Sequence, residues 1–213
     1  MKVPGAGRAG PQSDVLEKAL EDPEAAAHWL LVYMTYFRNI VATTARYLYR
    51  SVGLRAGMVQ LGSIVEEAVE RSFHVQRLSA QQRGMKLETV DDLFELNRAC
   101  HHDAAERLSP LGLEVFRIDR DPEGRYYMET EQCSLFRALD EAPVLRVFPV
   151  ALVSGLLRGL GYRSRWLTSV SEKERLCRSI ASGSSRPYDY VVYLDESLEP
   201  PACRVVVEQL SCS

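Results

Sequence analysis

The sequence predicts an α+β fold in which a helical layer packs on an antiparallel sheet. Through most of the first 108 residues, apolar side chains recur at steps of three and four, the period of an amphipathic helix. After Pro110 and Gly112 the pattern changes to the two-residue alternation of strands. The chain of 213 residues, 46% of them hydrophobic, is long and apolar enough to form one such domain. Residues 1–12, rich in Gly, Pro and Ala, are expected to be a flexible segment, and residues 13–213 a single α+β domain.

Two long helices are expected in the N-terminal third. Pro23 occupies a first-turn position that proline tolerates, and the helix that it opens should run to about Arg50. One stripe of this helix is apolar and is expected to face the core; it consists of Trp29, Tyr33, Phe37, Ile40, Thr44 and Leu48. Gly53 can end the helix, and a second one should follow from Leu54 to about Glu70.

The next elements are expected to be a loop, a helix and a hairpin. Residues 79–86 are polar and should form a loop, after which Thr89 or Asp91 caps a helix that continues to about Leu108. The four-residue sequence Asp-Pro-Glu-Gly at 121–124 is a turn signal. Because alternating segments flank it at 113–119 and 125–132, we expect an antiparallel hairpin there.

Residues 147–160 should form a helix that is buried on nearly all sides. Within it, Ala151, Gly155 and Gly159 recur at four-residue steps on one face. Each glycine costs about 1 kcal/mol relative to alanine in a helix interior. Close approach of another backbone would compensate for this cost, and the sequence leaves open whether that backbone is a helix or the sheet. Together with Arg158, these small residues are the candidate structural site of the chain.

Three further strands are expected in the C-terminal third, at 162–170, 188–194 and 203–209. A polar loop of about 16 residues should separate the first two. Helices, hairpin, buried helix and strands, in this order, are typical of a two-layer α+β domain.

No sequence motif of catalysis is present: the chain lacks a P-loop, a dinucleotide-binding glycine motif, a nucleophile elbow and a zinc-protease motif. The nearest reactive cluster is Cys-His-His-Asp at 100–103. Adjacent helical residues diverge by about 100°, so His101 and His102 cannot share one metal. Cys133 and Cys177 could meet near strand ends, but zinc would need further ligands, such as Glu172 or Glu174. We therefore predict that the chain is not an enzyme and holds no metal or cofactor.

The charged residues limit which partners the chain can have. The carboxylate pairs Glu66/Glu67 and Glu129/Glu131 are expected to face water. The net charge of −3 argues against a nucleic-acid partner. Residues 137–186 nevertheless carry nine basic and four acidic side chains, which are either ordinary solvated surface or a face for an acidic partner or an anionic membrane.

Five cysteines at irregular spacing favour a reducing compartment over a disulfide framework, and so a cytoplasmic protein. No uncharged stretch reaches the roughly 20 residues of a membrane span. The N-terminal segment lacks the apolar region of a secretory signal, which leaves a flexible head or the remnant of an organelle-targeting segment.

Two segments resemble a known superfamily. The segment 51–57, Ser-Val-Gly-Leu-Arg-Ala-Gly before an apolar helix, is similar to a helix start in the small subunits of TRAPP, the transport protein particle. The prokaryotic relatives of these subunits, the 4-vinyl-reductase domains, share this feature. The segment 155–159, Gly-Leu-Leu-Arg-Gly in a buried helix before a strand, is similar to a helix of one TRAPP small-subunit group. With the order of the elements, the resemblance covers about residues 45–195.

The resemblance implies a non-catalytic assembly subunit that pairs through its helices with a homologous subunit, as a homodimer or a heterodimer. It further implies vesicle tethering and support of nucleotide exchange on a Rab-type GTPase, at Golgi or endoplasmic reticulum membranes. The prokaryotic relatives imply an alternative, a sensor that binds a small hydrophobic molecule, for which Trp29, Phe37, Tyr126 and Trp166 are candidates. A lineage-specific structural subunit of another complex is the third interpretation. The cysteine that carries an acyl chain in some TRAPP subunits has no counterpart at 73–89.

Overall fold

The computed structural model describes the backbone of residues 23–108 and 116–212, and the side chains of residues 32–102 and 116–212. The expected flexible segment 1–12 lies outside these residues. The chain divides into two compact units, residues 1–43 and 44–213. The sequence-based division, with one domain over 13–213, stays a prediction.

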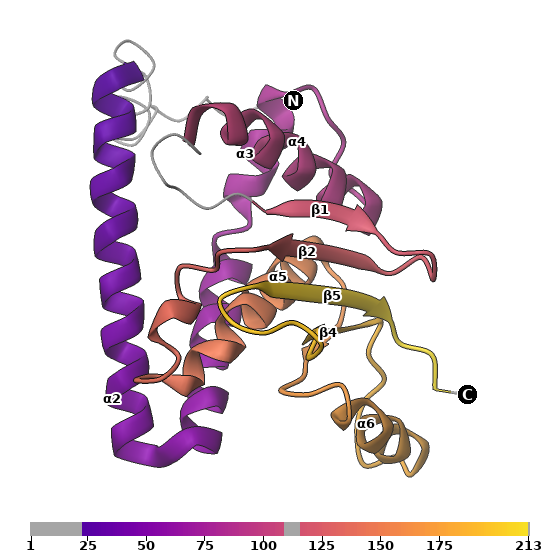
Figure 1. The fold of residues 1–213 in the computed structure, drawn as a ribbon. Helices are drawn as coiled ribbons and strands as arrows, with labels where there is room; N and C mark the ends of the chain where they lie inside the picture. The colour runs from indigo at the N-terminus through magenta and orange to yellow at the C-terminus, as the bar shows by residue number, and fades with distance from the viewer. Residues whose placement is uncertain (1–22, 109–115, 213) are drawn as a thin grey trace, which may run out of the picture. The chain divides into compact units, whose positions relative to one another are not determined.

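The fold is α+β, as predicted, with a five-stranded sheet in the order β1-β2-β5-β4-β3 (Figure 1). The strands are β1 (Arg117–Arg120), β2 (Tyr126–Thr130), β3 (Ser164–Trp166), β4 (Tyr190–Leu194) and β5 (Cys203–Gln209). The expected hairpin is confirmed, because β1 and β2 are antiparallel. The sheet is mixed rather than antiparallel, because the edge strand β3 runs parallel to β4. Helix α6 (Glu172–Ala181) connects these two strands, and a crossover of this kind returns the chain to the end of the sheet at which β3 began, as parallel strands require.

Helix α2 (Pro23–Arg71) bends at Gly53, whose φ of 79° and ψ of 179° lie outside the helical region. The predicted division into two helices at this glycine is therefore confirmed. In the first unit, which ends at Thr43, the expected core stripe is wrong: Tyr33, Phe37 and Ile40 are exposed. Leu48, the end of the same stripe in the second unit, is buried as predicted. The side chain of Trp29 lies outside the described residues.

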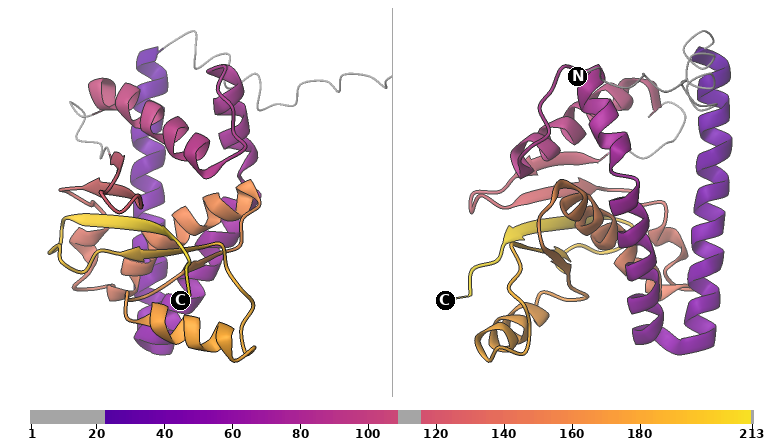
Figure 2. Two further views of the ribbon diagram at one scale, coloured as in Figure 1. Left: turned by 90° about the vertical axis from the view of Figure 1, so that its right-hand side faces the viewer. Right: turned by 180° about the vertical axis from the view of Figure 1, so that it is seen from behind.

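The second unit contains α3 (His74–Gln82), α4 (Val90–Leu108), α5 (Val147–Leu160) and α6 (Glu172–Ala181). Two short 3-10 helices, Phe136–Ala138 and Pro143–Arg146, lead into α5. The expected loop at 79–86 is wrong as far as Gln82, where α3 ends, and the expected polar loop after β3 contains α6. Figures 1 and 2 show α4 beside the hairpin and α5 alongside the sheet.

Helix α4 begins at the predicted cap. The N–H of Asp92 donates to the Thr89 hydroxyl at 3.2 Å, and an oxygen of the Asp92 carboxylate accepts the N–H groups of Glu88 and Thr89 at 2.9 Å. This reciprocal capping box satisfies N–H groups that have no partner within the helix. The same two backbone donors, Glu88 first, lower the pKa of Asp92.

The core lies on both faces of β4 and β5. Val191, Tyr193 and Val206 share one face, where Leu176 of α6 packs against them. The alternate residues, including Val192, Val205 and Val207, point to the opposite face, and α5 contacts both strands. Three consecutive valines of β5 are therefore buried, because helices cover the sheet from both sides.

Helix α5 occupies 147–160 as predicted and is buried along most of its length. Together with the 3-10 helix before it, it forms the one described segment, 143–160, that is long and apolar enough to cross a membrane by length and composition. Of this segment, 61% is buried inside the protein, as in a core helix.

Candidate functional site

The face of α5 that carries Ala151, Gly155 and Gly159 packs against the part of α2 that follows the bend at Gly53. We call this part, residues 54–71, the second arm of α2. A Cβ atom at Gly155 would lie 2.6 Å from the carbonyl oxygen of Glu66 and 2.8 Å from the Cβ of Val69. At Gly159 it would lie 2.4 Å from the ring of Phe73. Ala151, one turn earlier, is fully buried. The neighbour that the sequence left open is therefore a helix at this face.

A polar network joins α2, α5 and β3 beside this contact. The Ser154 hydroxyl donates to Oε1 of Glu66 at 2.6 Å, and Ser164 of β3 donates to the carbonyl oxygen of Ser154 at 2.9 Å. Arg158 binds two carboxylates of α2, Glu66 at 2.7 Å and Glu70 at 2.9 Å. Both serines are buried, so the network supplies partners for polar groups that would otherwise be costly inside the protein.

Glu66 is the member of this network that sequence reasoning missed. Its side chain is 12% exposed, whereas that of Glu67, which faces water as expected, is 62% exposed. Glu66 lies four residues after Gly62 and seven before Phe73, on the face of α2 that contacts α5 and β3. The four-residue spacing between Gly62 and Glu66 was therefore the signal in the sequence that could have predicted the inward position of Glu66.

The other carboxylate pair, Glu129 and Glu131, also has one bound member and one exposed member. Glu129 of β2 binds Arg204 of β5 at 2.5 Å, so it does not simply face water. Glu131, just beyond the strand, is exposed as expected.

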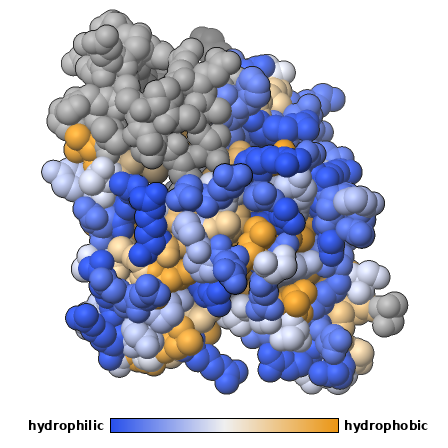
Figure 3. Space-filling model, viewed as in Figure 1, coloured by the Kyte–Doolittle hydropathy of each residue, from blue (hydrophilic) through white to orange (hydrophobic). Residues whose placement is uncertain are grey.

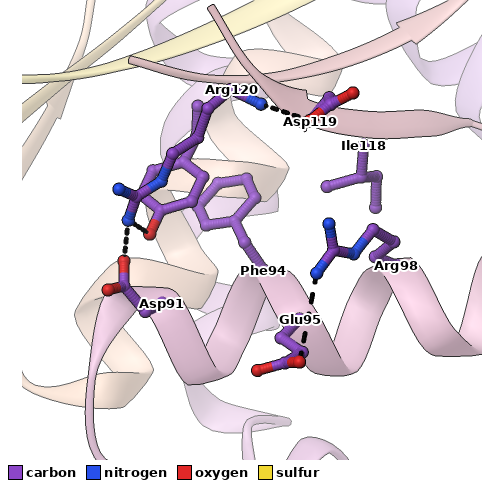
Figure 4. Close-up of a pocket in the computed structure, with 8 residues that line it drawn as sticks. Asp91, Phe94, Glu95, Arg98, Ile118, Asp119 and Arg120 are labelled. Atoms are coloured by element: carbon purple, nitrogen blue, oxygen red, sulfur yellow. Dashed lines mark hydrogen bonds and ion pairs between the residues drawn. The ribbon is translucent and has the colours of Figure 1, made fainter. Parts of the chain in front are cut away.

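A pocket of ≈ 300 Å³ lies between α4 and β1 (Figure 4). At one end, Arg120 of β1 binds both the carboxylate of Asp91, at the start of α4, and the hydroxyl of Tyr126. The guanidinium carbon of Arg120 lies 4.2 Å from the Tyr126 ring centroid, and that ring stacks on Phe94 at 4.3 Å. The stack attaches the hairpin to α4 at this end of the pocket.

The remaining charged groups of the pocket are also paired. Arg98 lies 3.9 Å from Glu95, and Asp119 accepts the backbone N–H of Arg120 at 2.9 Å and lies 3.5 Å from Arg117. The hydrogen bond from the Arg120 backbone, with the smaller effect of Arg117, lowers the pKa of Asp119. Ionised, paired carboxylates are poor general acids, and no Ser, Cys or His lines this pocket. The charged groups of this pocket therefore bind one another.

The Cys-His-His-Asp cluster does not converge on one point. Nδ1 of His101 accepts the N–H of Phe116 at 3.4 Å, and burial lowers the pKa of this imidazole. The Cys100 thiol contacts Ser79, His102 is exposed, and the Asp103 side chain lies outside the described residues. Among the residues that the structure describes, no three His, Cys, Asp or Glu side chains gather as metal ligands would.

Cys133 and Cys177 are not brought together. Cys133 is buried beside Cys203 and Phe136, whereas Cys177 of α6 forms a disulfide with Cys212, with a Cα–Cα distance of 5.3 Å. The expectation of reduced cysteines is therefore wrong for this pair. Irregular spacing concealed it, because the two partners lie 35 residues apart and become neighbours only when α6 packs beside β5.

Exposed apolar side chains gather on α2 within each unit. In the first unit, Tyr36 is 62% and Ile40 is 64% exposed, and Tyr33 and Phe37 lie on the same helical face. We call these four residues the aromatic stripe. In the second unit, Val52, Leu54 and Val59 are exposed and line a shallow groove near the bend at Gly53. Over the sheet and α6, by contrast, the surface seen in Figure 3 is largely hydrophilic, with apolar residues in small groups.

No protein-family model matches the chain, and no curated protein matches it.

Proposed function

We propose that this chain is a non-catalytic assembly subunit that pairs through α2 with a second copy of itself or a homologous subunit. The observation that carries the proposal is the aromatic stripe. Four large apolar side chains share one exposed face of a helix, and tyrosine and phenylalanine are among the residues enriched at protein interfaces. Contiguous apolar surface of this kind marks interaction sites in soluble proteins.

The finer assignment rests on the resemblance of residues 51–57 and 155–159 to TRAPP small subunits. In that assignment the subunit takes part in vesicle tethering and supports nucleotide exchange on a Rab-type GTPase at Golgi or endoplasmic reticulum membranes. Helical pairing is the property of that group that the aromatic stripe supports. The α+β fold agrees with the resemblance but is shared by many unrelated proteins, so it adds little to this assignment.

The mass of the purified protein in solution tests the proposal directly. We expect a dimer by sedimentation velocity at micromolar concentration, and a monomer when Ile40→Lys places a charge in the stripe. Asn39→Lys is the matched control, because it adds the same charge at an exposed position beside the stripe. A wild-type monomer up to about 100 μM, where even a weak specific interface is populated, would overturn pairing between copies. An Ile40→Lys variant that stays dimeric would place the interface elsewhere.

A further inference from the structure

A second cavity, of ≈ 450 Å³, lies between the second arm of α2, the edge strand β3 and α6. Three arginines line it, and each comes from a different element: Arg55 from α2, Arg165 from β3 and Arg175 from α6. We call this cavity the arginine cleft. Positive charges brought together by the fold repel one another unless an anion lies between them.

The single carboxylate of the cleft does not neutralise these charges. Both oxygens of Glu172 accept hydrogen bonds from Thr168, one from its N–H at 2.9 Å and one from its hydroxyl at 2.7 Å. Arg175 lies 3.6 Å from the same carboxylate. Neither Arg55 nor Arg165 has an ion-pair partner among the described residues. The cleft therefore carries a local charge of about +2.

Trp166 forms the floor of the cleft, and its contact with α2 fixes the position of its ring. Trp166 is 6% exposed, and its ring packs so closely on α2 that a Cβ atom at Gly62 would lie 2.5 Å from it. The guanidinium carbon of Arg165 lies 5.7 Å from the centroid of this ring. A fixed aromatic floor beside charged donors is typical of a site for an organic ligand.

One wall of the cleft is apolar and continues beyond it. Leu54, Met58 and Val59 of α2 line the cleft, and Leu54 and Val59 also line the shallow groove that reaches Val52. A ligand whose anionic group lies at the arginines would therefore meet apolar surface with the rest of its body.

We propose that the arginine cleft binds an organic anion, a phosphate or carboxylate joined to an apolar body. Arg55 and Arg165 bind the anionic group, because guanidinium groups match the oxygens of phosphates and carboxylates. The apolar body packs on Leu54 and Val59. The cleft shares no residue with the aromatic stripe, so this proposal does not depend on pairing between copies.

Calorimetric titration of the full chain with octyl phosphate, below its micellar concentration, tests the proposal. We expect one molecule to bind per chain, at least ten-fold more tightly than inorganic phosphate or octanol. Of these three compounds, only octyl phosphate combines an anionic group with an apolar chain. Nonanoate in the same titration distinguishes a carboxylate ligand from a phosphate ligand. Binding of neither amphiphile, or octanol binding as tightly as octyl phosphate, would overturn the proposal.

Variants assign the binding to the cleft. Because each charged hydrogen bond contributes substantially to affinity, the double variant Arg55→Gln and Arg165→Gln should weaken binding at least ten-fold. Arg178→Gln is the control, because it removes the same charge from an exposed position of α6 that does not line the cleft. Neither of the lost arginines has an ion pair with another described residue, so the double variant should melt at the wild-type temperature. Equal weakening by Arg178→Gln would indicate a general charge effect and refute the site.

A further variant tests the site with all of its arginines in place. Val59→Glu places a carboxylate on the wall of the cleft, where it should compete with the ligand for the guanidinium groups. We expect weaker binding than in the wild type. A vesicle assay distinguishes the cleft from a membrane surface: binding to phosphatidic acid vesicles without binding of soluble octyl phosphate would overturn the proposal in favour of a lipid surface.

Discussion

The Ser154 hydroxyl donates a hydrogen bond to the carboxylate of Glu66 across 2.6 Å, although the two residues lie 88 positions apart in the chain. Arg158 binds the other oxygen of the same carboxylate. Glu66 therefore joins the second arm of α2 to α5 at the point where Gly155 allows the helices to approach. The polar network and the glycine contact are parts of one interface, and each can be tested separately.

Loss of the Glu66 carboxylate should destabilise the protein measurably. Glu66→Ala removes the carboxylate to which the buried Ser154 hydroxyl donates and leaves it beside the Ser164 hydroxyl at 2.7 Å, and we expect the free energy of unfolding to fall by about 1–3 kcal/mol in urea titrations. Glu67→Ala is the matched control. Glu67 is exposed and forms a surface ion pair with Arg71, so its removal should cost about 0.5 kcal/mol or less. Equal effects of the two variants would contradict the role of Glu66 in the network.

A larger side chain at Gly155 should destabilise the contact between α5 and α2. Gly155→Leu cannot be accommodated without displacing the backbone of α2, because a Cβ atom alone would lie 2.6 Å from the Glu66 carbonyl oxygen. Overpacking of this kind typically costs about 1–3 kcal/mol, which thermal unfolding would detect. Ser63→Leu, at an exposed position of α2, is the control and should leave the melting temperature nearly unchanged. An unchanged melting temperature for Gly155→Leu would show that the interface opens.

Reduction of the disulfide between Cys177 and Cys212 should lower stability. The bond closes a loop of 35 residues and attaches α6 to the segment after β5. The chain-entropy relation for a loop of this length gives about 3–4 kcal/mol. Urea unfolding with and without a reducing agent measures the loss, and Cys212→Ser should reproduce it under oxidising conditions. Cys100→Ser, which removes a free cysteine, should not.

Stability should fall at high pH through Tyr193. Burial, followed by the charge of Glu208 and the hydrogen bond to it, raises the pKa of Tyr193 to about 12. An unfolded tyrosine loses its proton near pH 10, so the unfolded state binds fewer protons between pH 10 and 12 and becomes favoured as pH rises. The shift corresponds to about 1–3 kcal/mol, fully present below pH 10 and lost as pH approaches 12.

Urea titrations from pH 8 to 12 on the wild type and Tyr193→Phe measure this contribution. The phenylalanine variant lacks the titrating hydroxyl, so its stability should fall less steeply above pH 10. Parallel pH profiles for the two proteins would rule out a contribution from Tyr193.

Local signals were sufficient for several elements. The bend at Gly53, the Thr89 cap of α4, the hairpin around 121–124 and the bounds of α5 all agree with the sequence, because each depends on residues close to one another in the chain. Burial was harder to predict. The predicted core stripe of α2 has the spacing of a core face, yet Tyr33 and Ile40 are exposed, because periodicity shows which residues share a face but not what covers it.

Helix α6 shows a second reason for error. It is short and polar overall, and its narrow apolar face, which includes Leu176 and Ile180, is only partly buried, so the polar composition favoured a loop over a helix. Among the described residues, three of the contacts that attach it to the rest of the fold join distant parts of the chain: Leu176 on the sheet, the ion pair between Lys173 and Glu208, and the disulfide of Cys177. All three join residues distant in sequence, so they exist only once the sheet has formed.

The sequence by itself determined the class of the fold, the order of most of its elements and the need for a close neighbour at Gly155. These properties follow from helical and strand periodicity, turn residues and the missing side chain of glycine, all of which act over a few residues. Only the tertiary structure decided that this neighbour is α2, that Glu66 is drawn inside, that Cys177 meets Cys212 and that three arginines line one cleft. Each of these juxtapositions depends on how separate segments pack, because side-chain chemistry acts over a few ångströms and not along the chain.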